Sequence, residues 1–324
     1  MKIALIGAVS STLATLNKLV EHKMELISVL GYEPKDSTLV SGYSNLREVC
    51  STHHIFYKPF TKINTPDVVQ ILKTQSPDVI FIVGLSQLVS EEILELPTLG
   101  CVGFHPTKLP KGRGRAPIAW LVLEESLGAA NFFLMGKGAD DGPIFVQKDF
   151  AVDINDDASS IESKILCAID NCLDNWLPKL KEGIWEPVPQ DEAQATYYEK
   201  RAPEDGWIDW TDNSEKIDRL IKASAKPHPM AYSFHNGRKI LINRSRLEMQ
   251  MPIRGVSGRI LRLNKIGEAL VQCGDGLLWI SEFIYDNGDE VQLRVGQKIG
   301  YYAELEIYSL RQRIIELEKK INNL

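Results

Sequence analysis

The chain has 324 residues, of which 44% are apolar and 25% charged, and its net charge is -6. This length allows two domains, and the ordinary composition excludes a disordered chain or a fibre. The charge balance disfavours nucleic acid as a partner: residues 1–200 carry 18 Lys/Arg against 26 Asp/Glu, and residues 201–324 carry 19 against 17. A protein that binds phosphate backbones needs a dense basic face instead.

The cysteines form an odd set without a CxxC pair, which predicts neither a disulfide framework nor a zinc site and indicates a reducing cytoplasm. They are Cys50, Cys101, Cys167, Cys172 and Cys273. No apolar run approaches the length of a membrane span, and the first residues resemble a buried strand rather than a signal peptide. We therefore expect a soluble cytoplasmic protein without a membrane partner, and no bound metal because no metal-ligand spacing is present.

Strands alternate with helices in the first half of the chain. The continuous apolar run Lys2–Gly7 is typical of a parallel strand buried on both faces. Four further strands are predicted at residues 25–31, 78–84, 101–105 and 131–135, and helices at 13–22, 67–73 and 158–180. This order predicts an α/β fold with an N-terminal open, mostly parallel sheet whose ligands lie beyond the carboxyl ends of the strands. The first turn, Gly7–Thr12, is not G-x-G-x-x-G, so we expect no dinucleotide there.

The second half has a different pattern. A polar stretch at 188–206, which contains Pro189 and Pro203, is predicted to be a linker that follows a catalytic domain at 1–187. Short alternating segments with glycine-bearing turns then predict a smaller antiparallel β-barrel domain at 207–300. The last segment, 301–324, is predicted to be a charged helix with apolar heptads.

The apolar residues of that last segment repeat every seven positions. One heptad position holds Ile307, Ile314 and Ile321, and the complementary one holds Leu310, Leu317 and Leu324. Isoleucine at the first position and leucine at the second favour a parallel two-stranded coiled coil. In such a dimer Glu306 faces Arg311 and Arg313 faces Glu318 across the interface. We expect a homodimer through residues 301–324; the alternative is that the helix lays its stripe on its own barrel domain.

Many of the candidate catalytic and ligand-binding side chains occur in the segment from Gly103 to Trp120. His105 lies at the carboxyl end of a predicted strand and begins a loop rich in proline, glycine and basic residues. Asp140 lies in a tight turn after the next predicted strand, and we expect it to reach His105. A carboxylate beside an imidazole fixes its tautomer and makes a competent acid/base pair. His105 and Asp140 are therefore the predicted catalytic pair.

Several long sequence motifs resemble those of a known protein family. The segments HPTKLPKGRGRAPIAW, GADDGPI, DVIFIVGLSQLVSEEIL and EDGWIDW are similar to the methionyl-tRNA formyltransferase and sugar N-formyltransferase family, and the similarity extends to about residue 300. The resemblance implies a Rossmann-like formyltransferase fold, 10-formyltetrahydrofolate as co-substrate, and transfer of its formyl group to a primary amine. It places the folate slot at Leu85, Ser86, Gln87, Leu88, Gly138, Ala139 and Asp140.

The chain departs from the family pattern at one position. The usual motif is Asn-x-His, and the Asn position here is Gly103. Loss of one oxyanion donor typically costs about a hundred- to a thousand-fold in rate. Asn131 is a candidate replacement because its strand leads into the Asp140 turn; the alternative is that Asn131 only opens that strand.

The resemblance does not identify the amine that accepts the formyl group. We expect a nucleotide-linked amino sugar, a 4-amino-4,6-dideoxyhexose on UDP or dTDP such as a precursor of a nonulosonic acid. The run Gly-Arg-Gly-Arg-Ala-Pro is closer to sugar enzymes than to tRNA enzymes. Predicted sugar-nucleotide contacts are Lys108, Arg113 and Arg115 for the pyrophosphate, and Trp207 and Tyr232, with Trp210 and Phe234, as an aromatic platform unless these rings belong to the core. Three alternatives remain: a methionyl-tRNA formyltransferase, a formyl-folate hydrolase, and a non-catalytic folate or sugar-nucleotide binding protein.

Overall fold

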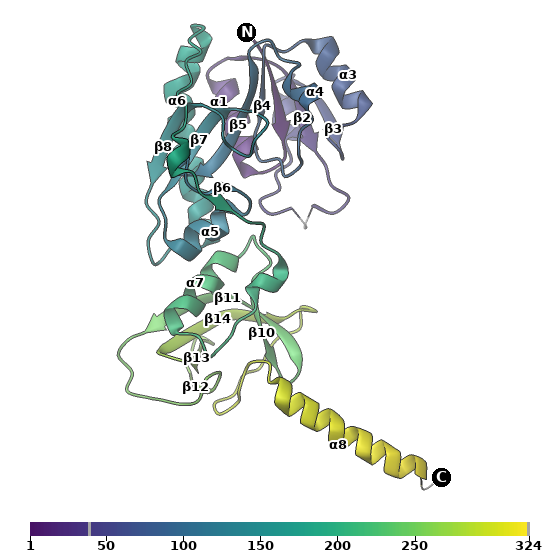
Figure 1. The fold of residues 1–324 in the computed structure, drawn as a ribbon, viewed down its shortest axis with the longest axis vertical. Coiled ribbons are helices and arrows are strands. Elements are labelled where there is room, and N and C mark those ends of the chain that lie inside the picture. Colours follow the sequence, from purple (N-terminus) through teal and green to yellow (C-terminus); the bar gives the residue numbers. More distant parts are fainter. Residues whose placement is uncertain (38–39, 323–324) are drawn as a thin grey trace. The chain divides into compact units, whose positions relative to one another are not determined.

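The computed structural model describes residues 1–37 and 40–322, and the chain forms two compact units (Figure 1). The first comprises Met1–Ala202 with Lys226–His228, and the second comprises Pro203–Ala225 with Pro229–Leu324. Most of the predicted linker, residues 188–202, therefore belongs to the first unit. The boundary, at Pro203, lies inside the predicted linker and near its C-terminal end.

The first unit is built on a seven-stranded sheet in the order β3-β2-β1-β4-β5-β7-β8. The five strands from β3 to β5 run parallel, whereas β7 and β8 run antiparallel to their neighbours. This confirms the mostly parallel sheet. The strands are β1 (Lys2–Gly7), β2 (Glu25–Tyr32), β3 (Phe56–Phe60), β4 (Val79–Ile82), β5 (Gly100–Thr107), β7 (Gly128–Leu134) and β8 (Ile144–Phe150).

Helices follow the strands along the chain. They are α1 (Ser10–Glu21), α2 (Arg47–Thr52), α3 (Pro66–Gln75), α4 (Glu91–Leu94), α5 (Pro117–Glu124) and α6 (Ala158–Lys181). The longest, α6, begins at a capping box in which the Asp157 carboxylate accepts from the backbone N–H of Ser160. Proline at the first position of α3 is compatible with the helix, because that N–H has no intrahelical partner.

Both faces of the sheet are covered, which explains the continuous apolar strands. On β4, Ile80 and Ile82 join the apolar cluster that also contains Leu72 of α3. The intervening Phe81 points to the opposite face, where its ring centroid lies 5.8 Å from that of Trp176 on α6. Successive side chains of a strand point to opposite faces, so the sheet contributes to an apolar core on each side. Only the loops at the ends of the strands remain to form a site.

The segment 188–202 packs onto the first unit through its backbone. A short strand, β9 (Tyr197–Tyr198), pairs in parallel with β6 (Arg113–Gly114). The Tyr198 ring stacks on that of Trp120 in α5, with centroids 5.4 Å apart, and Val188 forms a bridge with Ile144. These contacts fix residues 188–202 against the loop that follows His105.

The second unit contains an antiparallel sheet in the order β10-β11-β14-β13-β12, with α7 (Ser214–Ser224) packed on β11. Its strands are β10 (Ala231–His235), β11 (Arg238–Glu248), β12 (Ile260–Leu263), β13 (Ala269–Gln272) and β14 (Leu277–Tyr285). The structure confirms the antiparallel strands. Residues 296–300 connect the two edge strands: the backbone N–H of Gly296 donates to Ile260 of β12, and the N–H of Gly300 donates to Phe234 of β10. The sheet edges are thus joined, as the predicted small barrel requires.

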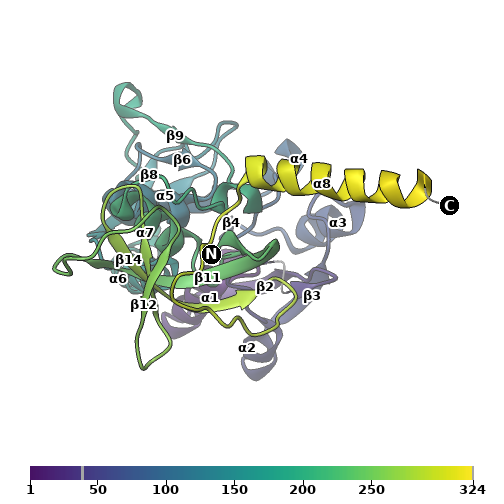
Figure 2. The same ribbon diagram turned by 90° about the horizontal axis from the view of Figure 1, so that it is seen from below.

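The chain continues into one helix, α8 (Ala303–Asn322), which Figure 2 shows unbroken along its length. Its sequence begins with acidic residues and ends with basic ones, an order that complements the helix dipole. No helix in the described part of the chain is both long enough and apolar enough to cross a membrane.

Candidate active site

A cavity of about 630 Å³ opens in the first unit at the loops that follow β1, β4 and β5. This volume lies within the range of small-molecule sites. Residues 84–89, 103–106, 114–118 and 135–140 form much of its wall, together with the start of α1 and one face of α6. The position agrees with the rule that open parallel sheets bind ligands beyond the carboxyl ends of their strands.

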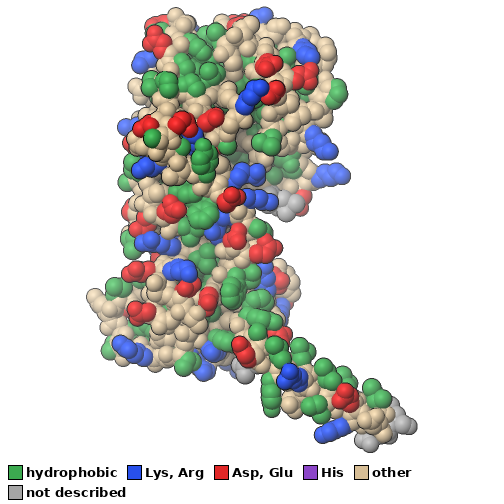
Figure 3. Space-filling model, in the orientation of Figure 1, with side chains coloured by type: hydrophobic (Ala, Val, Ile, Leu, Met, Phe, Trp, Pro, Cys, Tyr) green, Lys and Arg blue, Asp and Glu red, His purple; other side chains and the backbone are tan. Residues whose placement is uncertain are grey.

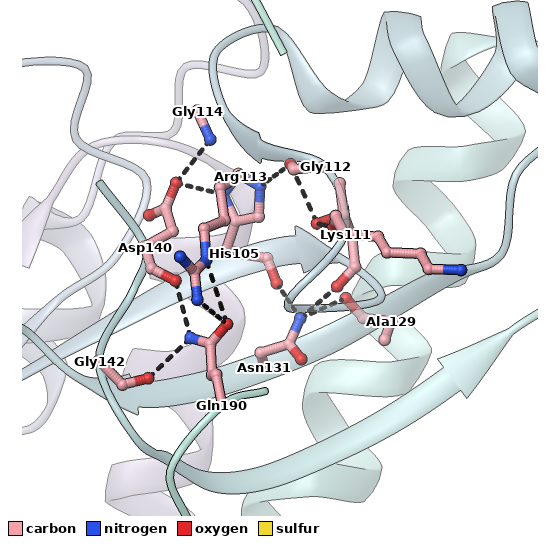
Figure 4. Close-up of polar contacts among 11 residues, drawn as sticks. His105, Lys111, Gly112, Arg113, Gly114, Ala129, Asn131, Asp140, Gly142 and Gln190 are labelled. Atoms are coloured by element: carbon pink, nitrogen blue, oxygen red, sulfur yellow. Dashed lines mark hydrogen bonds and ion pairs between the residues drawn. The ribbon is translucent and has the colours of Figure 1, made fainter. Parts of the chain in front are cut away.

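His105 lines this cavity near the end of β5, and its side chain is almost fully buried. Its Nε2 lies 2.8 Å from the carbonyl oxygen of Gly112, and its Nδ1 lies 3.3 Å from Oδ2 of Asp140 (Figure 4). A carbonyl oxygen only accepts, so Nε2 carries the proton and donates it to Gly112. This assignment leaves Nδ1 as the nitrogen that exchanges a proton, with the Asp140 carboxylate beside it.

Asp140 reaches His105 by an indirect route. Because β7 is antiparallel to β5, the carboxyl end of β7 at Leu134 lies opposite Val102 and not opposite His105. The loop after β7 returns to His105, and Asp140 takes a left-handed backbone conformation with φ 53°. The backbone N–H of Gly114 donates to Asp140 Oδ2 at 2.9 Å. The predicted catalytic pair is thus brought together, with the carboxylate held from two sides.

Gln190 supports the Asp140 loop from the segment predicted as linker. Its Nε2 donates to the carbonyl oxygens of Asp140 and Gly142 at 2.8 and 2.7 Å. Its Oε1 accepts from the guanidinium of Arg113, at 2.9 Å from the nearer nitrogen. Sequence analysis did not identify Gln190, because a glutamine in a polar stretch gives no local signal.

Arg113 is a structural residue and not a free phosphate ligand. Its side chain is fully buried, and its two terminal nitrogens donate to the Glu192 carboxylate at 2.6 and 2.9 Å. Hydrogen bonding to Glu192 raises the pKa of Arg113 against the opposing effect of burial. Figure 4 shows Arg113 between His105 and Gln190, so this arginine links the β6 loop to residues 190–192.

The other predicted contacts to the sugar nucleotide have different positions. Arg115 lines the cavity and is exposed. Lys108 lies outside the cavity wall and pairs with Asp149 of β8. Only Arg115 of the three basic residues is thus placed to meet a ligand in this cavity.

The predicted aromatic residues lie in the second unit. Trp207 is partly exposed and forms an isolated bridge with Tyr232, whose ring lies 3.9 Å from the Lys239 ammonium. Trp210 belongs to the core of that unit and donates to Ser233 Oγ at 2.8 Å, so for Trp210 the core assignment is correct.

The predicted folate residues all line the cavity. The loop after β4 contributes Leu85, Ser86, Gln87 and Leu88, and the loop after β7 contributes Gly138, Ala139 and Asp140. Gln87 does not point its amide at the ligand space. It accepts from the backbone N–H of Ile63 and donates to the carbonyl oxygen of Thr61, both at 2.9 Å. This side chain therefore anchors the slot and leaves the loop backbone to face a ligand.

The position of the family asparagine is closed by apolar side chains. A Cβ on Gly103 would lie 2.8 Å from Phe133 Cζ and 2.9 Å from Met135 Cγ, so a larger residue fits only if these two move. Asn131 does not replace the missing amide: it is fully buried, is not in the cavity wall, and donates to the carbonyl oxygens of His105, Thr107 and Ala129. Its contacts hold the irregular register where β5 passes from His105 to Thr107.

The wall of the cavity that is formed by α6 and the start of α1 is mixed: Ala158, Ile165 and Leu166 are apolar, and polar side chains stand beside them. Glu162 of α6 accepts a short hydrogen bond from the Ser10 hydroxyl, and Ser11 and Ser41 line the same cavity. The folate residues lie on other loops, beside Phe133 and Met135. The cavity is thus largely apolar and carries a small group of hydroxyls with one carboxylate. In residues 1–37 and 40–322, no cluster of three or more His, Cys, Asp or Glu side chains is arranged to hold a metal ion.

Two family models match the chain: "Formyl transferase" over residues 1–174 and "Formyl transferase, C-terminal domain" over residues 200–295. The chain belongs to the formyl transferase family, and it is an enzyme of formyl transfer. Among curated relatives, the methionyl-tRNA formyltransferase of Caldanaerobacter subterraneus subsp. tengcongensis is 29% identical over 299 residues, which cover 91% of this chain and 95% of that protein.

Two solved structures show the same fold at low sequence identity. An N-formyltransferase from Helicobacter canadensis, in complex with folinic acid and dTDP-3-aminofucose, has a TM-score of 0.64 at 16% identity and covers 88% of this chain and 100% of that one. HypX from Aquifex aeolicus in complex with tetrahydrofolic acid has a TM-score of 0.64 at 18% identity and covers 88% of this chain and 44% of that one.

Proposed function

We propose that this protein transfers the formyl group of 10-formyltetrahydrofolate to the primary amine of a nucleotide-linked amino sugar. The observation that carries the reaction type is the placement of His105 in the cavity wall, between the Gly112 carbonyl and the Asp140 carboxylate. The folate is supported by the family and by the two solved relatives, which hold folinic acid and tetrahydrofolic acid.

The proposed mechanism follows from the two ring nitrogens of His105. The neutral amine attacks the formyl carbon, and a new C–N bond forms as the carbonyl becomes an oxyanion. Nδ1 takes the proton that the amine nitrogen loses, and the imidazolium is stabilised by Asp140 and by the Gly112 carbonyl. The same proton then passes to N10 of the folate as its bond to the formyl carbon breaks. The products are the formamide and tetrahydrofolate, and His105 is neutral again.

The imidazolium of His105 also takes over the task of the missing asparagine amide. With Gly103 covered by Phe133 and Met135, position 103 supplies no side-chain donor to the oxyanion. A positive charge in a buried site stabilises a developing oxyanion more strongly than it does in water. We therefore assign both the proton transfer and the main charge stabilisation to one residue.

The polar side chains within the cavity wall support a small, hydroxylated amine as acceptor. Glu162 with Ser10 offers acceptors to an ammonium or to sugar hydroxyls. Arg115 is the exposed cation available for a pyrophosphate. A 4-amino-4,6-dideoxyhexose on UDP or dTDP, of the kind used for surface polysaccharides, matches both features. The Helicobacter canadensis relative holds dTDP-3-aminofucose, a related molecule.

Methionyl-tRNA is the second candidate acceptor, because the curated relatives that cover nearly the whole chain are methionyl-tRNA formyltransferases. The charge distribution weighs against it. The protein carries a net charge of -6, and residues 201–324 are close to neutral, whereas binding of a tRNA backbone requires a basic path.

The cysteines support a reducing, cytoplasmic setting for this reaction. The cysteines of the described chain are free, and all but Cys167 are buried. Burial raises the pKa of the Cys101 and Cys172 thiols to about 12, so neither is a reactive thiolate at neutral pH.

An amine-dependence assay tests the proposed reaction class. With 10-formyltetrahydrofolate alone, the enzyme should release little tetrahydrofolate, and a cognate amine should accelerate that release. Release of free formate at the same rate without any amine would show a hydrolase instead. Folate binding without release of tetrahydrofolate, with either class of acceptor present, would show a non-catalytic binding protein.

A further inference from the structure

The helix α8 carries an uncovered apolar stripe. Its isoleucines and leucines at the two heptad positions are between 46% and 68% exposed in the described part of the helix. Figure 3 shows hydrophobic side chains along it. The members of the stripe are Ile307, Leu310, Ile314, Leu317 and Ile321; Leu324, the last predicted member, lies outside the described residues. These exposures do not agree with the alternative that α8 packs its apolar face against its own unit. Helices in proteins gain most of their stability by burying such a face.

We propose that the stripe is covered by α8 of a second copy of this chain, in a parallel two-stranded coiled coil. A seven-residue repeat keeps the apolar seam facing a partner helix as the two helices supercoil. The described first positions hold Ile307, Ile314 and Ile321, and the second positions hold Leu310 and Leu317 after Ala303 in the first turn. Isoleucine at the first position with leucine at the second is the combination that favours two strands. A seam of this kind is self-complementary, so a second copy is the occupant that matches it.

The charges that flank the seam select the parallel orientation. In a parallel pair, Glu306 faces the partner's Arg311, and Arg313 faces the partner's Glu318. In an antiparallel pair that aligns Ile307 with Leu317, Arg311 would face Arg311 and Arg313 would face Arg313. Glu304 would then also face Glu318. Like charges at three of these flanking positions disfavour that alignment, whereas both flanking pairs of the parallel arrangement are attractive.

Dimerisation through α8 is independent of the proposed chemistry. The cavity and His105 belong to the first unit, whereas α8 belongs to the second. We therefore expect dissociation of the dimer to leave turnover per chain unchanged. This separates a failure of the dimer proposal from a failure of the proposed function.

Light scattering on the full-length chain tests the assembly. Wild type should have twice the 36.4 kDa chain mass at micromolar concentration. Ile314→Asp should raise the dissociation constant by at least about tenfold, because a charge then replaces an apolar side chain inside the seam. Gln312→Asp, on the opposite side of the helix, is the matched control and should remain dimeric. A monomeric or trimeric wild type, or an Ile314→Asp variant as dimeric as wild type, would overturn the proposal.

Cross-linking and charge exchange test the orientation. In a Cys167→Ser background, Leu310→Cys should form a disulfide-linked dimer on mild oxidation, whereas Ser309→Cys, outside the seam, should not. Arg311→Glu should weaken the dimer, and adding Glu306→Lys should restore it, since the two positions face each other only in the parallel pair. Absence of cross-linking at Leu310, or absence of rescue, would exclude the parallel coiled coil.

Discussion

Gln190 donates a 2.8 Å hydrogen bond to the backbone carbonyl of Asp140, across fifty residues of chain. The glutamine in turn accepts from Arg113, which is held by Glu192. The orientation of the carboxylate beside His105 therefore depends on a segment whose residues, 188–202, do not line the cavity.

The first prediction concerns this support. Gln190→Leu should lower kcat by about tenfold or more, because small displacements of a positioned catalytic group have large effects on rate. The KM for formyl-folate should change little. Gln194→Leu is the matched control, since Gln194 is exposed in the same segment and its amide contacts only Asp191 among the described residues. Equal kcat values for the two variants would show that Gln190 does not position Asp140.

The second prediction concerns the catalytic pair. His105→Ala and Asp140→Asn should each lower kcat by about a hundredfold or more, the usual contribution of a general acid/base group. The double variant should be little worse than the worse single variant, because the two residues act as a unit. Single-turnover rates measure the effect, with folate binding as the test of fold. Retention of more than about a tenth of wild-type kcat by His105→Ala would contradict the assignment.

The third prediction concerns Gly103. Restoring the family residue by Gly103→Asn should destabilise the protein and lower kcat, because the new side chain collides with Phe133 and Met135. Met135→Ala, added to Gly103→Asn, should recover part of both losses. The melting temperature and kcat of the single and double variants measure this coupling. A Gly103→Asn variant more active than wild type would show that position 103 is open.

The fourth prediction concerns Glu162, the carboxylate that α6 contributes to the cavity wall. Glu162→Gln should raise the KM for the amine acceptor by about tenfold, the scale of one lost hydrogen bond to a charged group, without weakening folate binding. Glu182→Gln, an exposed residue just beyond the end of α6, is the control. A matching loss of folate affinity would place Glu162 on the folate side.

The fifth prediction concerns acid stability at the start of α6. Burial tends to raise the pKa of Asp156, but hydrogen bonds from Lys164, the Asp153 backbone and Ser160 lower it below its ordinary 3.8. A lowered folded-state pKa contributes stability that is present above the unfolded pKa and is lost as pH falls through the folded value. Asp156→Asn should therefore cost about 1–3 kcal/mol at pH 7, and its free energy of unfolding should converge with that of wild type in acid. Parallel curves from urea titrations between pH 7 and pH 3 would contradict this origin.

The parts of the fold that the sequence predicted are those with a local signal. Buried strands such as Lys2–Gly7 carry one continuous apolar run, and His105 ends such a run. The missed strands lack that signal: β3 contains Lys58 and Pro59, which an edge strand tolerates, and β8 is the half-exposed opposite edge.

The site was predictable only in part, because its support depends on contacts between distant segments. His105 and Asp140 stand in motifs, but no pattern links Arg113 to Gln190 and Glu192. An arginine such as Arg113 is the residue type expected to bind phosphate. Its buried contacts with Gln190 and Glu192 form only when residues 190–198 fold beside it. Asn131 was likewise suggested by its place on a strand, and its three carbonyl partners emerge only from the register of β5 and β7.

Mass spectrometry of acceptors incubated with 10-formyltetrahydrofolate and the wild-type enzyme identifies the amine that receives the formyl group. A panel of UDP- and dTDP-linked amino sugars is compared with methionyl initiator tRNA, each at equal concentration and with His105→Ala as the blank. We expect a gain of one formyl group on at least one 4-amino-4,6-dideoxyhexose nucleotide and none in the blank. Formylation of methionyl-tRNA with every sugar unchanged would contradict this expectation.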